Sequence, residues 1–130
     1  MSSAVETGRS QPRGSGRSRT VLAALGALCA GVAVAMAAYA SHGVEGTAQS
    51  WLQTAALFGF GHGLALAVLA PQPGRRLRLA ALLLMFIGMV LFSGSLAGAA
   101  LMGWPTAAAP LGGSLMILGW LVLAADLLRD

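Results

Sequence analysis

Charged side chains are scarce in this sequence of 130 residues. They make up 9% of the chain, whereas an average soluble domain has about 25%. A soluble fold this poor in charge would expose a large apolar surface, which water-soluble monomers avoid. Between Arg78 and Asp126 the sequence has no formal charge at all. The scarcity of charge excludes an ordinary soluble domain and favours a protein surrounded by lipid.

Lysine and asparagine do not occur, and cysteine occurs once. Every basic residue is therefore an arginine, and no site for N-glycosylation exists. Cys29 cannot form a disulfide within the chain, and we interpret it as a small packing residue. The net charge of +4 does not indicate nucleic-acid binding, because the arginines flank apolar segments, where they meet anionic headgroups and set the topology.

Long apolar runs, by contrast, are abundant. About 20 apolar residues cross the ~30 Å hydrocarbon core of a bilayer as an α-helix. Four such runs predict transmembrane helices with the approximate spans 20–40, 52–70, 79–102 and 107–128. The runs are continuous rather than alternating, which favours helices over a β-barrel. The predicted fold class is all-α, an integral membrane four-helix bundle whose domain covers residues 20–128.

The segment before the first apolar run is rich in Ser, Gly and Arg. It cannot bury enough surface to offset its ordering entropy, so residues 1–19 are predicted to be a disordered basic cytoplasmic tail. The run that follows also resembles a signal peptide, with Ala38-Tyr39-Ala40 as the cleavage motif. We favour a retained span, because run 20–40 is longer than the usual apolar core of a signal peptide, about 7–15 residues.

The arginine distribution predicts the orientation of the spans. Seven of the eight arginines lie in the tail and in the loop 74–78, whereas the loops 41–50 and 103–110 hold none. Because arginine-rich loops stay in the cytoplasm, both termini are predicted to be cytoplasmic, N-in/C-in, in a multi-pass protein of the bacterial inner membrane. Asp126, at the end of the last span, is expected to reach for the headgroups.

Four stretches of the sequence are similar to the motifs of a known family. They are AAYASHG at 37–43, WLQTA at 51–55 with HGLA at 62–65, LFSGSL at 91–96, and PLGG at 110–113 with LGW at 118–120. In this order they resemble the domain-of-unknown-function 423 family of small bacterial inner-membrane proteins, which is similar to eukaryotic transmembrane protein 256. The match covers roughly residues 22–125 and departs from the family pattern at Ser41, Phe58 and Gly61. The resemblance implies the fold and the membrane location, and it gives no activity.

His62 is the residue that points most directly to chemistry, because it lies near the middle of the second span, where polar groups are costly and often functional. At about 100° per residue, it shares one helix face with Trp51, Thr54 and Phe58. This face is predicted to point into the bundle and, with Ser93 of the third span, to form a candidate polar site. His62 is either a proton or ligand site, or a neutral imidazole whose bond to a hydroxyl or backbone carbonyl holds helices together.

Small residues at close spacing predict where helix backbones approach one another. They are Ala27 and Gly31 in the first span, Gly94 and Gly98 in the third, and Gly112 and Gly113 in the fourth. The serines of the third span are expected to bond the carbonyl one turn back on their own helix.

No cofactor or metal site is expected, because no cluster of carboxylates or thiolates joins His42 and His62. The spans also lack the acids and bases that an enzyme needs, so we expect a protein that is not an enzyme. The favoured hypothesis is a structural or accessory protein that binds membrane lipids, a partner membrane protein or further copies of itself. The alternative is a minimal oligomeric transporter or channel built around His62.

Overall fold

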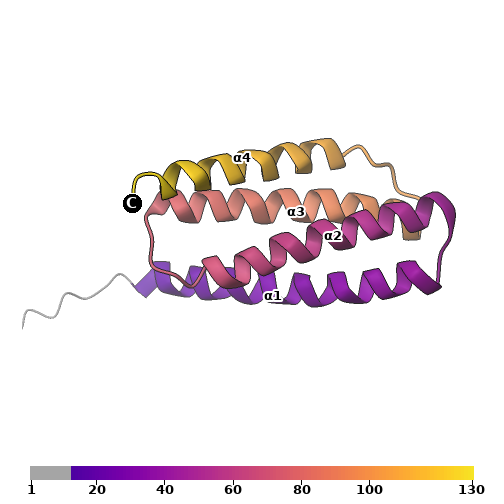
Figure 1. Ribbon diagram of the computed structural model, residues 1–130, viewed down its shortest axis with the longest axis horizontal. Helices are drawn as coiled ribbons and strands as arrows, with labels where there is room; N and C mark the ends of the chain where they lie inside the picture. The colour runs from indigo at the N-terminus through magenta and orange to yellow at the C-terminus, as the bar shows by residue number, and fades with distance from the viewer. Residues whose placement is uncertain (1–12) are drawn as a thin grey trace, which may run out of the picture.

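The computed structural model describes residues 13–130, and the regular structure in this part of the chain is helical. The helices are α1, Arg13–His42; α2, Gly46–Leu69; α3, Arg76–Met102; and α4, Ala109–Leu127. Each contains a stretch that is long and apolar enough to cross a membrane. The predicted all-α fold of four membrane-spanning helices is confirmed (Figure 1).

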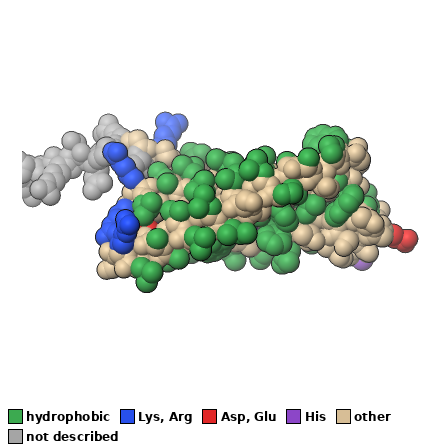
Figure 2. All heavy atoms as spheres, turned by 90° about the horizontal axis from the view of Figure 1, so that it is seen from above, with side chains coloured by type: hydrophobic (Ala, Val, Ile, Leu, Met, Phe, Trp, Pro, Cys, Tyr) green, Lys and Arg blue, Asp and Glu red, His purple; other side chains and the backbone are tan. Residues whose placement is uncertain are grey.

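The helices form two antiparallel hairpins that meet along α2 and α3. Helix α1 packs on α2, α3 packs on α4, and α2 joins the hairpins by packing on α3. Helices α1 and α4 consequently lie at opposite edges of the arrangement (Figure 1). Hydrophobic side chains cover the length of the bundle, and basic side chains gather at one end (Figure 2). This distribution suits a bilayer, in which lipid covers the apolar length and headgroups meet the arginines.

The first helix begins earlier than the sequence predicts. Residues 13–19 are helical rather than part of a disordered tail, whereas residues 1–12 lie outside the described residues. Extending an existing helix needs no new nucleus, so each further residue gains a backbone hydrogen bond at low cost. The side chain of Arg19 secures this turn, because it donates hydrogen bonds to the backbone carbonyls of Gln72, Gly74 and Arg75 in the loop between α2 and α3.

Glycines bring the two helices of each hairpin into backbone contact. In the first hairpin, a Cβ atom on Gly63 would lie 2.6 Å from the carbonyl oxygen of Gly26 and 2.8 Å from the nitrogen of Ala30. In the second hairpin, a Cβ atom on Gly112 would lie 2.6 Å from the carbonyl oxygen of Gly88. A side chain at Gly63 or Gly112 would have to push the helices apart, so both crossings depend on glycine.

Two of the small-residue pairs predicted to pack helices do not do so. Gly31 and Gly94 are exposed and have open space where a Cβ atom would lie, and Ala27 is exposed as well. Gly98 is covered by the ring of Trp104, which follows in the same chain segment. These predictions are wrong because spacing alone does not identify the packed face of a helix that is apolar all round.

The packed face of α1 is displaced by one residue from the predicted pair and carries Gly26 and Ala30 instead. In α4, Gly112 lies at the crossing with α3, and its neighbour Gly113 would make only an ordinary van der Waals contact, 3.8 Å, with the ring of Phe92.

Candidate functional site

His62 lies inside the bundle, on the side of α2 that faces α4. Only 8% of the residue is exposed. Its Nδ1 atom lies 2.9 Å from the carbonyl oxygen of Phe58, one turn back on α2. Its Nε2 atom lies 2.9 Å from the indole Nε1 of Trp120 on α4, 58 residues away in the sequence. Both ring nitrogens of His62 therefore have a hydrogen-bond partner.

These two partners define the protonation state of His62. The indole N–H of Trp120 can only donate, so Nε2 of His62 must present a lone pair. The carbonyl of Phe58 can only accept, so Nδ1 carries the hydrogen. His62 is accordingly a neutral imidazole in the Nδ1–H form. A proton on Nε2 would set two N–H groups against each other and break the link to Trp120.

Aromatic rings enclose the imidazole and connect three helices. The ring of Phe58 is stacked on that of His62 at 6.0 Å between centroids, and Trp120 meets the imidazole edge-on at 5.8 Å. Phe58 in turn packs against Phe92 of α3, at 4.8 Å between centroids. Aromatic pairs in these arrangements add to the stability that burial alone provides. His62 thus ties α2 to α4 through Trp120, and its neighbour Phe58 ties α2 to α3 through Phe92.

The predicted inward-pointing face around His62 is only partly buried. Trp51 and Phe58 are 36% and 37% exposed, and the hydroxyl of Thr54 bonds the Ser50 carbonyl of its own helix. Both residues still lie towards the second hairpin, because Phe58 packs on Phe92 of α3 and Trp51 lines a pocket with Phe92 and Ala109. The fully buried face of α2 is instead centred on small residues that admit neighbouring helices. That face consists of Leu52, Ala55, Ala56, Gly59, His62, Gly63 and Leu66.

Ser93 makes a second polar link between the hairpins. Its buried hydroxyl donates a hydrogen bond of 2.9 Å to the carbonyl oxygen of Ala55, so it joins α3 to α2. The expectation of a bond within its own helix is wrong, because Gly59 lets α3 come close: a Cβ atom there would lie 3.7 Å from the Ser93 hydroxyl oxygen. The hydroxyl of Ser95 is buried without a hydrogen-bond partner among the described residues.

A polar cluster that sequence reasoning missed lies at the arginine-rich end. The side chain of Asp126 is fully buried, and Arg78, whose side chain is 11% exposed, donates to it through Nε at 2.8 Å. Arg78 also bonds the carboxylate of Asp130. The expectation that Asp126 reaches for the headgroups is wrong, because it pairs instead with a cation 48 residues away. The sequence does hold a signal, since these two residues bracket its longest charge-free stretch.

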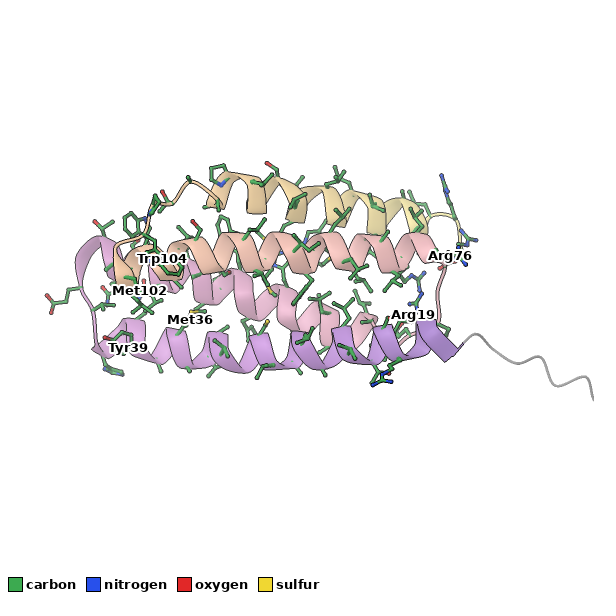
Figure 3. The ribbon with its side chains drawn as sticks, turned by 180° about the vertical axis from the view of Figure 1, so that it is seen from behind. Arg19, Met36, Tyr39, Arg76, Met102 and Trp104 are labelled. Atoms are coloured by element: carbon green, nitrogen blue, oxygen red, sulfur yellow. The ribbon has the colours of Figure 1, made fainter. Side chains whose placement is uncertain are left out.

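The arginines at this end divide into two kinds. Arg19, Arg75 and Arg78 bond within the protein; Arg75 donates to the carbonyl of Arg129 at 2.8 Å. Arg17 and Arg76 make no side-chain hydrogen bond or ion pair to the residues whose side chains the structure describes. Arg19 and Arg76 lie at the same end of the bundle, opposite Tyr39, Met102 and Trp104 (Figure 3).

Groups of three or more His, Cys, Asp or Glu side chains that could hold a metal ion do not occur within residues 13–130. His42 is exposed at the end of α1, whereas His62 lies in the interior of α2. The two histidines are thus not brought together as a ligand pair.

Four apolar helices, joined inside by neutral hydrogen bonds and closed at one end by ion pairs, define a multi-pass membrane protein. The chain belongs to the DUF423 family, described as a protein of unknown function, whose sequence profile matches residues 36–113. The resemblance inferred from the sequence motifs is thereby confirmed.

Two bacterial relatives support this assignment and the membrane location. The chain is 34% identical over 116 residues to a UPF0382 membrane protein of Haemophilus influenzae, and this alignment covers 81% of the chain and 88% of the relative. It is 40% identical over 114 residues to a UPF0382 membrane protein of Staphylococcus epidermidis, and this alignment covers 81% of the chain and 93% of the relative. No solved structure matches the chain significantly.

Removal of the hydrogen bond between His62 and Trp120 is expected to weaken the contact between the hairpins. Trp120→Phe removes the N–H donor and His62→Leu removes its acceptor, so each should cost about 1–2 kcal/mol of unfolding free energy. His62→Gln should retain most of the stability, because the amide oxygen can accept from the indole. Unfolding in bicelles measures these losses. If the losses of the two single variants simply add in the double variant, the two side chains are not coupled.

Proposed function

We propose that this protein is a non-enzymatic structural or accessory protein of the membrane, which acts on lipids or partner helices through its lipid-facing surface. The observation that carries this proposal is the bonding of His62. Both of its ring nitrogens are occupied by protein partners, and the indole donor requires the neutral form. The imidazole consequently serves as a connection between helices and offers no free atom to a proton or ligand.

Two further interior polar groups support the same role. The hydroxyl of Ser93 is used in the link to Ala55, and the Asp126 carboxylate is paired with Arg78. A catalyst in the bilayer needs an acid, a base or a metal that can reach its substrate. In this protein the side chains of His62, Ser93 and Asp126 are used instead in contacts that hold α2, α3 and α4 together.

Flux measurements on proteoliposomes test this proposal. Under a pH gradient, vesicles that contain the protein should show no more proton or solute flux than empty vesicles. His62→Leu should lower stability and leave flux at this background. A pH-dependent flux that both His62→Leu and His62→Gln abolish in folded protein would contradict the proposal and favour an oligomeric transporter or channel.

The orientation of the four spans is part of the proposal. The gathering of arginines at one end of the bundle supports an N-in/C-in arrangement, because basic residues stay on the cytoplasmic side. Reporter fusions after Gly74 and Asp130 are expected to report the cytoplasm, and fusions after Gly46 and Thr106 the outside. A reporter that is external at Asp130 would rule this arrangement out.

A further inference from the structure

A lateral groove lies between α1 and α3, with α2 as its floor. Its middle section has a volume of about 330 Å³ and is lined by Leu28 and Val32 from α1, Val90 and Gly94 from α3, and Gly59 from α2. Met36 extends from α1 into the far end of this section (Figure 3). The lining is almost entirely apolar. Its one hydroxyl group, that of Ser93, already donates a hydrogen bond to the Ala55 carbonyl of α2.

A second section of about 420 Å³ continues the groove towards the arginine-rich end. The same two helices line it, with Val21 and Leu25 from α1 and Leu83 and Phe86 from α3, and Arg17 stands at its end. The two sections follow each other within about one helical turn on both helices. Together they form one apolar groove along the surface, which ends at the guanidinium group of Arg17.

One arginine lines the end of this groove and a second begins α3 at the same end of the bundle, and neither makes a side-chain hydrogen bond or ion pair to a residue whose side chain the structure describes. Arg17 lines it directly. Arg76 precedes Leu83 by seven residues, so the two share one face of α3. The neighbouring Arg19, Arg75 and Arg78 are instead bonded to carbonyls or carboxylates of the protein.

This combination fits an amphiphile with one negative headgroup. A guanidinium group binds phosphate oxygens through paired N–H donors. From Val21 to Val32 the groove extends about 17 Å at ~1.5 Å per residue, close to the ~15 Å that an acyl chain spans from headgroup to midplane. A second copy lying parallel in the groove would bring its own arginines to the same mouth, where like charges repel.

We propose that this groove binds one anionic phospholipid in the leaflet that the arginine-rich end faces. One acyl chain lies between α1 and α3, and the phosphate lies at Arg17 and Arg76. This inference rests on the proposed function and names the class of ligand for it.

Native mass spectrometry of the protein in mild detergent tests the site, with phosphatidylglycerol and phosphatidylcholine of identical acyl chains as the probes. The unaltered protein is expected to retain phosphatidylglycerol preferentially. Arg17→Gln should weaken this retention about fivefold, the effect of one basic residue near an anionic surface. Arg129→Gln is the matched control, because Arg129 is exposed at the same end but follows α4, away from the groove.

A second pair of variants tests the apolar part of the groove. Gly94 lines it and has open space at its Cβ position, so Gly94→Leu should fill the groove without disturbing the fold and should abolish retention of phosphatidylglycerol. Gly31 has equally open space but is not in the lining, so Gly31→Leu should leave retention unchanged.

Three results would overturn the proposal: equal retention of the two lipids, equal effects of Arg17→Gln and Arg129→Gln, or a dimer that cross-links through Cys29 and is dissociated by Gly94→Leu. The last result would assign the groove to a second copy, since Cys29 lines it. If the protein shows neither a lipid preference nor flux, the lipid site is wrong and the proposed structural role is unaffected. A flux that depends on His62 would contradict the structural role, whatever the result with lipids.

Discussion

The Arg78→Met variant is expected to lose about 3–5 kcal/mol of unfolding free energy, the typical cost of removing one partner from a buried ion pair. The substitution leaves the fully buried carboxylate of Asp126 without the cation that donates to it at 2.8 Å. Asp126→Leu should cost less, because Arg78 then still pairs with Asp130. Unfolding of the purified variants in bicelles measures both losses.

The double variant Arg78→Met/Asp126→Leu is the control for this prediction. It removes both charges and fills the space with apolar groups, so it should recover most of the stability that Arg78→Met loses. Arg76→Met, at an exposed arginine of the same first turn of α3, should have little effect. A loss at Arg78→Met no larger than at Arg76→Met would show that the ion pair does not hold α3 and α4 together.

Replacing a glycine at a helix crossing by alanine is also expected to lower the unfolding free energy strongly. At Gly63 and at Gly112 the added methyl group would meet backbone atoms of the facing helix at 2.5–2.6 Å. Backbone cannot rotate away as a side chain can, so each substitution should cost about 2–3 kcal/mol, the upper part of the range for overpacking.

Gly31→Ala and Gly94→Ala are the matched substitutions. Both glycines are exposed with open space around the Cβ position, and alanine is the better helix former, so both variants should be neutral or slightly more stable. The same unfolding assay compares the four variants. Equal losses at all four positions would mean that α1 and α3 are rotated relative to the structure described.

The contrast between Gly26 and Ala27 shows why the sequence predicts the helices but not their packed faces. A continuous apolar run is sufficient to predict a membrane span, and all four spans are present. In a soluble helix the change from apolar to polar residues marks the buried face, but lipid is as apolar as the protein interior. Nothing in the sequence then distinguishes the pair Gly26–Ala30, which packs on α2, from the pair Ala27–Gly31, which faces outward.

The sequence predicted two of the interior polar residues, His62 and Ser93, but not the partners that they bond. His62 stands out because a polar group inside the membrane needs a reason. Its partner Trp120 lies 58 residues away, and Arg78 and Asp126 are 48 residues apart. Only the packing of α2 and α4 against α3 brings these residues together. For Asp126 the sequence pointed to headgroups, although an available arginine at the start of α3 offered a partner of opposite charge.

Nitrogen NMR of the His62 imidazole in lipid bilayers tests its structural role most directly. In a His42→Gln background His62 is the only histidine of the chain, so its ring signals can be assigned without ambiguity. At neutral pH a protonated Nδ1 and an unprotonated Nε2 are expected, with Nε2 coupled to the indole N–H of Trp120. An imidazolium with both nitrogens protonated, or a ring that carries its hydrogen on Nε2, would contradict the structural role and reopen His62 as a proton site.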